Sequence, residues 1–424
     1  MNRRAGLSRR RVPSRRAGAV AMAFALLPAL LAASACGGSA DAAGGDGDYA
    51  VMTWSPSGTG SADRPGVTAL AEAIGRDVNA KGGLNGRKLR VLTCNEHNSV
   101  EGATACVRQA VDAKVIAVIG SYSQYGDSFM PALESAGIPY IGGYGLSGPE
   151  FSSPLSYPVA GGTPTLIAGS GRQLVAAGCR TVAVVRPDTR AGDTLTRYLS
   201  GALNPAGVKL ADVRVVEKSA DYATAAQKAV GDDRQGNCVI DALGPEQTLK
   251  LLDSYKQLSP RRTVLASVIG SIQQSVVDST GGENGPLDGA YATGWYPPES
   301  SGVWDGLRAA AAGDSRIATS DLAVQTTWVA YQVLLQAADR LGSAGRPLTA
   351  RNLRGQLDSG DSLDTGGVTP PLNWGMTDML PSAESPRLVN TWVTFQQVKG
   401  GRLTGQQSGF VDVRWALTGG RPPQ

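Results

Sequence analysis

The chain has 424 residues, which is too long for a single small domain. Hydrophobic residues make up 42% and charged residues 18%, a globular balance that excludes a disordered or collagen-like chain. The sequence holds one histidine, which excludes His-rich metal sites and makes any Ser-His-Asp enzyme depend on His97.

The first 35 residues predict a removable secretory signal. Residues 1–16 hold seven arginines and no acid, an Ala- and Leu-rich stretch follows, and a small-residue cleavage site ends the segment. A transmembrane anchor is the competing interpretation, but the apolar stretch is barely long enough to cross a bilayer. Residues 8–12 weakly resemble a twin-arginine signal, so the export route stays open between Sec and twin-arginine.

Cys36 follows this signal in a segment, Ala33–Gly38, that resembles the lipobox of bacterial lipoproteins. Ala33 replaces the usual leucine, and Ala33–Ala35 equally suits cleavage of a plain secreted protein. Cysteine parity favours the lipoprotein, because removing Cys36 from the five cysteines leaves an even set. We therefore expect an extracytoplasmic protein that is anchored to the cell membrane by lipid on Cys36, with residues 36–47 as a flexible tether.

The charge balance changes once the signal is removed. The whole chain has 40 basic and 36 acidic residues, and the signal carries seven of the basic ones. The remainder therefore has no basic excess, which argues against nucleic acid as a partner.

From Tyr49 the sequence alternates short apolar runs with amphipathic stretches, the pattern of a parallel α/β domain. The first such unit has predicted strands over Tyr49–Trp54, Arg87–Thr93, Val115–Gly120 and Ile138–Ile141, and predicted helices over Pro65–Lys81, Glu101–Ala113 and Met130–Ala136.

A second unit of similar size follows. Its predicted helices are 164–178, Leu195–Leu203, Tyr222–Val230 and Glu246–Gln257, and its predicted strands are Thr181–Arg186, Val213–Val216, Cys238–Leu243 and Thr263–Ser267.

The last third predicts a strand, three helices and a late β segment. These elements are Ala290–Trp295, then Val303–Ala312, Asp321–Leu341 and Ala350–Asp358, then Leu388–Val398 and Gly409–Val413. We expect two parallel-sheet α/β lobes joined by multiple crossovers. The predicted boundaries are 48–160 with 290–345 for lobe I, and 161–289 with 346–424 for lobe II.

The run Asn79–Arg87 (NAKGGLNGR) is the most specific motif, and its Asn and Gly residues suit a turn from helix to strand. With Val118–Ser121, Gly137–Ile141, Ala220–Tyr222 and Ala330–Gln332, it resembles the leucine/isoleucine/valine-binding family of ABC-transporter substrate-binding proteins. The resemblance covers about 49 to 415 and implies a type 1 periplasmic-binding fold, whose two lobes close on a ligand.

Ligands of open parallel sheets bind outside the carboxyl ends of the strands. Three first-lobe loops qualify there, and the second lobe and the crossover add further candidates. The candidate ligand-binding residues are Trp54, Ser55, Ser121, Tyr122, Ser123, Tyr144, Gly145, Ser147, Tyr222, Gly244 and Trp295. The resemblance implies that Ser121 or Ser123, together with Ser147, holds the ligand's carboxylate and ammonium. Turn capping is the alternative role for each hydroxyl, and core packing is the alternative for Trp295.

Two departures from the family pattern concern the ligand. Residues 267–270 hold no acid to pair with an ammonium, and residues 189–192 hold no aromatic residue. Both argue against a free amino acid. Arg190 suits an anionic ligand, with a solvated surface charge as its competing interpretation.

The four remaining cysteines suggest one disulfide in each lobe, Cys94–Cys106 and Cys179–Cys238. Cys94 ends a predicted strand and Cys106 lies on the inner face of the next helix, while Cys179 and Cys238 each begin a strand. Four cysteines allow three connectivities, and the sequence does not choose among them.

The function expected from the resemblance is a monomeric solute-binding lipoprotein that works with ABC permease subunits. Its ligand would be a branched-chain or apolar amino acid or a related carboxylate. A ligand-binding sensor for a membrane signalling partner is the alternative. We expect no enzyme, cofactor or metal, because no Gly-x-Ser-x-Gly elbow, Walker motif, dinucleotide fingerprint or metal cluster is found, and His97 reads as a surface histidine.

Overall fold

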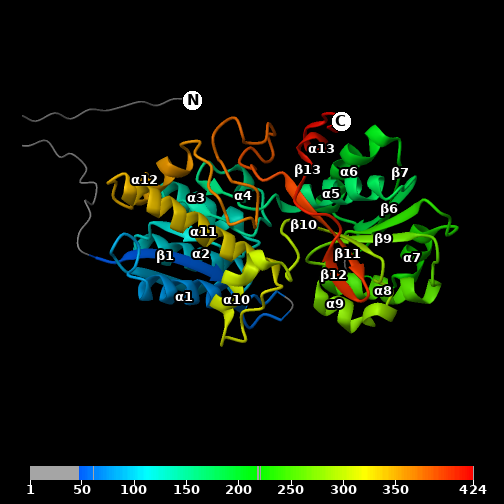
Figure 1. Ribbon diagram of the computed structural model, residues 1–424, viewed down its shortest axis with the longest axis horizontal. Helices are drawn as coiled ribbons and strands as arrows, with labels where there is room; N and C mark the ends of the chain where they lie inside the picture. The colour runs from blue at the N-terminus through cyan, green and yellow to red at the C-terminus, as the bar shows by residue number, and fades with distance from the viewer. Residues whose placement is uncertain (1–46, 61, 217–218, 220, 424) are drawn as a thin grey trace, which may run out of the picture. The chain divides into compact units, whose positions relative to one another are not determined.

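The computed structural model describes residues 47–60, 62–216, 219 and 221–423 (Figure 1). The predicted signal, Cys36 and all but the last residue of the predicted tether lie outside this range. Within it, no helix has both the length and the apolar character that a bilayer crossing needs. The same residues hold no group of three or more His, Cys, Asp or Glu side chains placed to share a metal ion.

The first lobe is built on a parallel sheet in the order β2-β1-β3-β4-β5. Its elements up to residue 157 are β1 (Tyr49–Ser55), α1 (Pro65–Ala80), β2 (Leu89–Asn95), α2 (Val100–Asp112), β3 (Ala117–Ile119), α3 (Gly126–Ala136), β4 (Tyr140–Ile141), α4 (Pro149–Ser152) and β5 (Ser156–Tyr157). Neither α4 nor β5 was predicted, because each is too short to show a hydrophobic period.

The second lobe is built on a larger sheet in the order β12-β11-β10-β9-β8-β6-β7, with β13 paired to β11. Its first helices are α5 (Gly162–Ala176), α6 (Arg190–Leu203), η1 (Asn204–Ala206), α7 (Ala223–Val230), α8 (Pro245–Leu258), α9 (Gln274–Ser279) and η2 (Gly282–Asn284). Its parallel strands are β6 (Thr181–Pro187), β7 (Lys209–Val215), β8 (Asn237–Asp241), β9 (Val264–Val268) and β10 (Tyr291–Gly294). The chain ends with the antiparallel strands β11 (Trp392–Lys399), β12 (Arg402–Gly405) and β13 (Val411–Asp412), then α13 (Arg414–Thr418).

Between β10 and β11 the chain returns to the first lobe. This part contains η3 (Gly302–Trp304), α10 (Asp305–Ala311), α11 (Leu322–Ser343) and α12 (Ala350–Leu357), and Figure 1 shows α10 to α12 in yellow and orange beside the blue and cyan elements. The α11 helix is bonded to the first sheet, because Thr327 Oγ1 donates to the Gly120 carbonyl at 2.6 Å and the Tyr331 hydroxyl lies 3.0 Å from Thr53 Oγ1. The predicted fold class, two parallel α/β lobes with several crossovers, is confirmed.

Two of the predicted lobe boundaries differ from this arrangement. We expected 290–345 in the first lobe, but β10 hydrogen-bonds to β9 and β11 of the second sheet. We expected 346–424 in the second lobe, but α12 packs on α11, and its Leu353 and Leu357 lie in the first lobe's core. A strand belongs to the lobe whose sheet it hydrogen-bonds to, and a helix belongs to the lobe whose core covers its apolar face. Neither of these partners can be identified from the local sequence.

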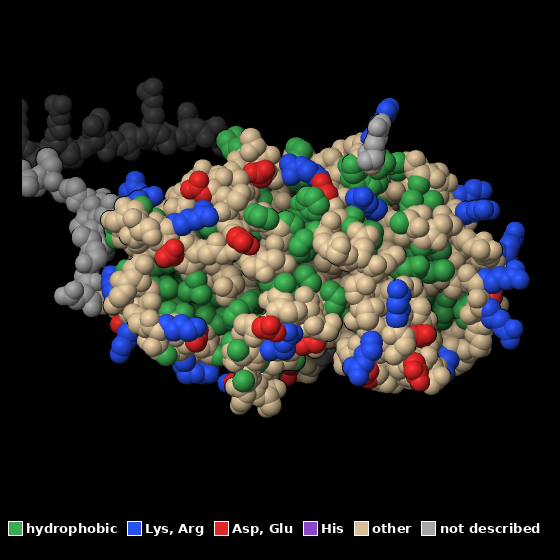
Figure 2. Space-filling view, in the orientation of Figure 1, with side chains coloured by type: hydrophobic (Ala, Val, Ile, Leu, Met, Phe, Trp, Pro, Cys, Tyr) green, Lys and Arg blue, Asp and Glu red, His purple; other side chains and the backbone are tan. Residues whose placement is uncertain are grey.

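The core of each lobe lies on both faces of its sheet, because side chains alternate along a strand. On β1, Tyr49 and Val51 face α1 and α11, while Met52 and Trp54 face α2 and α3. On the solvent-exposed face drawn in Figure 2, Lys and Arg side chains lie among Asp and Glu side chains, so charges of both signs are mixed there.

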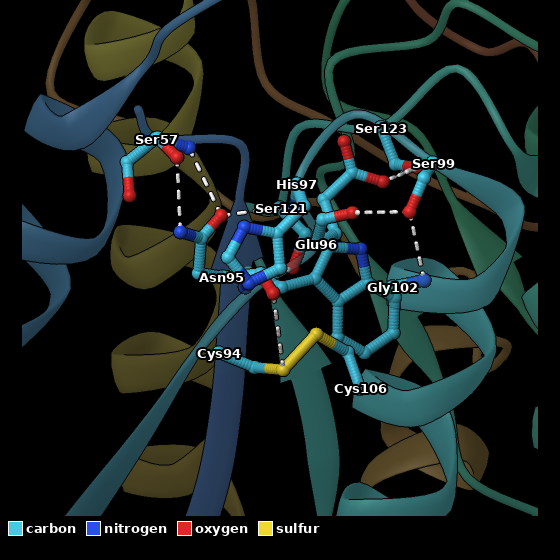
Figure 3. The surroundings of a disulfide bond; sticks show 11 residues. Ser57, Cys94, Asn95, Glu96, His97, Ser99, Gly102, Cys106, Ser121 and Ser123 are labelled. Atoms are coloured by element: carbon cyan, nitrogen blue, oxygen red, sulfur yellow. Dashed lines mark hydrogen bonds between the residues drawn. A yellow bond between two sulfur atoms is a disulfide. The ribbon is translucent and has the colours of Figure 1, made fainter. Parts of the chain in front are cut away.

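Both predicted disulfides are confirmed. Cys94–Cys106 joins β2 to α2 (Figure 3), and Cys179–Cys238 joins the residue two before β6 to β8. Each bond therefore ties neighbouring elements within one lobe.

The Asn79–Arg87 run forms the predicted turn between α1 and β2. Gly83 has a positive φ of 82°, and a Cβ there would lie 2.1 Å from the Arg87 carbonyl oxygen, so only glycine fits. The Asn79 side chain bridges to β2, because its amide bonds both the N–H and the carbonyl of Leu89 at 2.8 and 2.9 Å.

Candidate functional site

The two lobes meet along a row of aromatic side chains. Tyr122 follows β3, Tyr144 follows β4, and Trp295 directly follows β10. The rings of Tyr122 and Tyr144 have centroids 5.0 Å apart, and those of Tyr144 and Trp295 are 5.5 Å apart in an edge-on arrangement. The indole of Trp295 also donates to the Gly162 carbonyl at 3.1 Å. The structure thus brings three of the predicted site residues together from distant parts of the chain.

Beside this row lies a cavity of about 570 Å³, which we call the Ser147 cavity. The first lobe lines it with Gly145–Gly148 and Phe151, and the second lobe lines it with the ends of β6 and β8 and the first turns of α6. Most of its wall is formed by apolar side chains and by side chains with a hydroxyl group. The apolar ones include Phe151, Pro164, Pro187 and Leu195, and the hydroxyl-bearing ones include Ser147, Thr163, Thr189 and Thr194. The carboxyl ends of strands from both sheets therefore face one space, as ligand sites of open sheets require.

The loop after β4 is held by a carboxylate that is not among the predicted site residues, Glu150. This buried side chain accepts hydrogen bonds at 3.0 Å from the N–H groups of Gly145, Leu146 and Ser147, and at 2.9 Å from the Ser147 hydroxyl. Burial raises the pKa of Glu150, and these hydrogen bonds oppose the rise. The Ser147 hydroxyl, which the resemblance assigns to a ligand, thus already donates to a carboxylate of the chain itself.

A local signal does exist for Glu150. Glu150 follows Ser147 by three residues, with Pro149 between them, which is the spacing of a capping box at a helix start. The glutamate side chain returns to the backbone N–H of Ser147, but the other half of that motif is not formed: Gly148 is the N-cap residue of α4, and the Ser147 hydroxyl donates to the Glu150 side chain.

The loop after β3 is held in a similar way by Glu96, whose carboxylate lies beside Ser123 (Figure 3). Ser123 Oγ donates to Glu96 at 2.7 Å and accepts from the Tyr125 N–H, while Ser121 Oγ accepts from the Trp54 N–H at 3.1 Å. Burial raises the pKa of Glu96. No sequence signal links Glu96 to Ser123, because they are 27 positions apart and meet only through the sheet.

Of the eleven predicted ligand-binding residues, Gly145 and Ser147 line the Ser147 cavity and the other nine do not. Trp54 is fully buried against Phe129 and Tyr140, because its place in the β1 alternation turns it toward α2 and α3. Ser55 donates to the Arg64 carbonyl at 2.8 Å.

In the second lobe, Tyr222 is buried in the core and Gly244 is the N-cap residue of α8. Neither residue lines the Ser147 cavity.

The first turn of α6 faces the Ser147 cavity with Thr189, Ala191 and Gly192. Thr189 caps this helix, since its hydroxyl accepts from the Gly192 N–H at 3.0 Å. Arg190 is exposed and does not line the cavity. Helix N-termini carry a partial positive charge, and the acid in this first turn, Asp193, is bonded to Arg186 at 2.8 Å.

The charged residues around the cavity are held in pairs. Among the described lining residues Glu384 is the only acid, and Arg197 Nη1 donates to it at 3.0 Å. Buried Arg186, next to the lining residue Pro187, bonds Asp212 at 2.7 Å and Asp193 at 2.8 Å.

His97 lies in the loop after β2 with an exposed side chain and a positive φ of 51°. Its backbone N–H donates to Asn95 Oδ1 at 2.9 Å. This is the surface position expected from the sequence.

Comparisons with known proteins concern the family and the fold of the chain. The model of a family described as periplasmic binding protein matches residues 51–401. Three solved structures share the fold over most of the length of both chains. An extracellular ligand-binding receptor from Verminephrobacter eiseniae has a TM-score of 0.69 at 17% identity, over 84% of this chain and 99% of that one.

The second, a possible leucine/isoleucine/valine-binding protein from Rhodopirellula baltica, has a TM-score of 0.68 at 14% identity, over 87% of this chain and 98% of that one. The third is an ABC-transporter solute-binding protein from R. palustris in complex with benzoate. It has a TM-score of 0.64 at 16% identity, over 86% of this chain and 97% of that one. At such identities the likeness shows the fold. No curated protein sequence matches significantly.

Proposed function

Because this chain belongs to the periplasmic binding protein family, we propose that it is the extracytoplasmic solute receptor of an ABC importer and binds its solute in the Ser147 cavity. One observation carries the proposal: strand ends of both sheets, after β4 in one lobe and after β6 and β8 in the other, line a single space of about 570 Å³. A solute there contacts both lobes, so it favours the arrangement in which they approach each other. A lipid on Cys36 would keep this receptor at the membrane, near the permease.

The solute class that we propose is a small apolar carboxylate, in preference to a free amino acid. The apolar wall suits a hydrocarbon body, and the N-terminal turn of α6 suits a carboxylate. An ammonium group needs an acid, and Glu384, the only described acid in the wall, is paired with Arg197. Two neighbours point the same way: the R. palustris protein was solved with benzoate, and a Thermomonospora curvata relative is named a fatty acid ABC transporter substrate-binding protein.

The carboxylate is expected at α6 rather than at the loop after β4. Three N–H groups and one hydroxyl of that loop bind Glu150, and a second carboxylate there would face a like charge.

The solute class is tested with two compounds that differ only in the ammonium group, leucine and 4-methylpentanoate. Calorimetric titration of the purified protein should show that 4-methylpentanoate binds at least ten times more tightly than leucine. Native mass spectrometry of the protein as purified adds the identity of any co-purifying solute. Tighter binding of leucine would overturn the carboxylate assignment.

The location is tested with a steric block. Ala191→Trp places a large side chain in the cavity from an exposed helical position, and Ala223→Trp makes the same change at an exposed position on α7 outside it. Binding should be lost in Ala191→Trp and kept in Ala223→Trp. Full binding by both variants would exclude the Ser147 cavity.

A further inference from the structure

The first lobe has a basic surface at the end of its sheet where the strands begin. At that end Tyr49 of β1 donates its N–H to the Lys88 carbonyl at 2.8 Å, and Ile116, just before β3, donates to the Ala50 carbonyl at 2.8 Å. Because β1 lies between β2 and β3, the turns that lead into those two strands flank the start of β1. We call residues 47–50, 77–90 and 108–116 the β1-start surface.

Basic side chains outnumber acidic ones on the β1-start surface. Its acids are Asp48, Asp77 and Asp112, and its basic residues are Lys81, Arg87, Lys88, Arg90, Arg108 and Lys114. Asp77 is paired with Lys81 at 2.7 Å. Four of the basic side chains are exposed and have no ion pair with another described residue; they are Lys88, Arg90, Arg108 and Lys114. Since the chain outside the predicted signal has no basic excess, this excess is local.

The neighbouring end of α11 does not cancel this charge. The Asn85 side chain joins it to the β1-start surface by donating to the Ala338 carbonyl at 2.9 Å. The residues that follow, 339–346, hold Arg340 and Arg346 against the single acid Asp339.

The described part of the chain begins at the β1-start surface. Arg87 Nη2 donates to the Gly47 carbonyl, and the Arg87 guanidinium lies 4.1 Å from the centre of the Tyr49 ring. Gly47 is eleven residues from Cys36, and a fully extended chain spans at most about 3.6 Å per residue. A lipid on Cys36 would therefore hold this surface within about 40 Å of the bilayer.

An anionic membrane is the partner whose chemistry fits such a surface. Clusters of about four to eight Lys and Arg side chains close to a lipid anchor or a membrane segment bind anionic headgroups, and this attraction needs exposed charge rather than a pocket. None of the large apolar side chains that are exposed in the described residues belongs to the β1-start surface. Contact would therefore be with the headgroups and not with the hydrocarbon layer.

We infer that the β1-start surface lies against the membrane and binds anionic phospholipid headgroups through Lys88, Arg90, Arg108 and Lys114. The inference rests on the lipid on Cys36 in the proposed function for the nearness of the bilayer, and it adds which face of the protein meets that bilayer. Because the whole surface belongs to the first lobe, the second lobe stays free to move when the solute binds.

Hydrogen exchange of the purified wild-type protein tests this surface on two kinds of vesicle. One kind is phosphatidylcholine alone, and the other is an equal mixture of phosphatidylcholine and phosphatidylglycerol. Exchange of the backbone N–H groups of residues 81–90 and 108–116 should be at least three-fold slower on the mixed vesicles than on the neutral ones. Raising the salt to about 1 M, where the Debye length is about 3 Å, should remove the difference.

Two double variants with the same change in net charge locate the effect. Lys88→Glu with Lys114→Glu reverses two charges of the β1-start surface and should remove the slower exchange. Arg180→Glu with Lys209→Glu is the matched control and should keep it, because these exposed residues lie where β6 and β7 begin, in the second lobe. The salt series on the wild-type protein covers the case in which the first variant does not fold.

Flotation with the neutral vesicles measures the lipid on Cys36 separately, because those vesicles carry no anionic headgroup. A protein that floats with them but exchanges equally on both kinds of vesicle would overturn the inference and leave the lipid anchor standing. A protein that does not float with them, yet exchanges more slowly beside the mixed vesicles, would support the surface and overturn the anchor. Slower exchange that persists in Lys88→Glu with Lys114→Glu, or that polyglutamate in solution reproduces, would overturn the assignment of this surface to the membrane.

Discussion

Glu150 accepts two hydrogen bonds from Ser147, one from its backbone N–H at 3.0 Å and one from its hydroxyl at 2.9 Å. The pair closes the loop after β4 on itself and presents Ser147 and Gly145 to the Ser147 cavity in one conformation. The Glu150 carboxylate thus organises this loop. Without it, the N–H and hydroxyl donors of the loop would suit an anionic ligand. Loop shape and solute class are therefore linked through this carboxylate.

Replacing Glu150 tests that link. Glu150→Gln keeps one acceptor oxygen but turns an amide nitrogen toward the donors of the loop, so the free energy of unfolding should fall by about 1–3 kcal/mol. Ser147→Ala removes one hydroxyl bond and should cost about 1 kcal/mol. Urea unfolding of the three proteins measures both effects. A Glu150→Gln protein as stable as wild type would show that the carboxylate does not organise the loop.

The pH dependence of stability should carry the signature of Asp241, at the end of β8. This buried carboxyl accepts from Thr248 Oγ1 at 2.7 Å and from the Leu243 N–H at 3.2 Å, and burial raises its pKa from 3.8 to about 6. The folded protein therefore binds this proton more tightly than the unfolded chain. The stabilisation is complete below about pH 4 and is lost as the pH rises through about 6.

Asp241→Asn isolates this contribution from those of the other acids. The stability of wild type relative to Asp241→Asn should fall by about 3 kcal/mol between pH 4 and pH 7, from a shift of about two pKa units. Urea unfolding at four pH values in that window measures the difference. A difference that stays constant with pH would contradict the assignment.

The two disulfides should differ in what they contribute to stability. Cys94–Cys106 spans 12 positions and Cys179–Cys238 spans 59, and a longer closed loop restricts the unfolded chain more. Replacing the first pair by alanine should cost about 3 kcal/mol, and replacing the second about 4 kcal/mol. Thermal and urea unfolding of the two double variants compare them directly. A larger loss from the shorter loop would mean that native packing, not chain restriction, dominates.

A close backbone approach at the start of α2 depends on Gly102. A Cβ there would lie 1.9 Å from the Glu96 carbonyl oxygen, so Gly102→Ala must move the segment that carries Glu96. We expect a loss of about 2–4 kcal/mol, as for other forced overlaps in a packed site. Gly148→Ala is the control: its φ is −55° and a Cβ there meets nothing within 4 Å, so its stability should change by less than about 0.5 kcal/mol. Equal stability of the two variants would contradict the geometry.

Most strands and helices follow from local pattern. The alternation of apolar runs and amphipathic stretches predicted the two α/β lobes, and the Gly-rich turn at Asn79–Arg87 was correctly predicted. The start of a helix differs from the predicted one where a capping residue determines it. The α6 helix begins at Arg190, five residues before the predicted start, because Thr189 caps it. Both suggested disulfides are present, although four cysteines allow three pairings and the sequence did not choose among them.

The amino-acid sequence alone was sufficient for the fold class and the family resemblance, because these depend on periodicities and spacings within short stretches. Tertiary structure decided which lobe holds β10 and α12, that Trp54 faces the core, and that Glu96 binds Ser123 across 27 positions. It also decided that the Ser147 cavity forms between the lobes. These features arise from contacts between distant segments, and no local pattern of residues records which segments the folded sheets bring together.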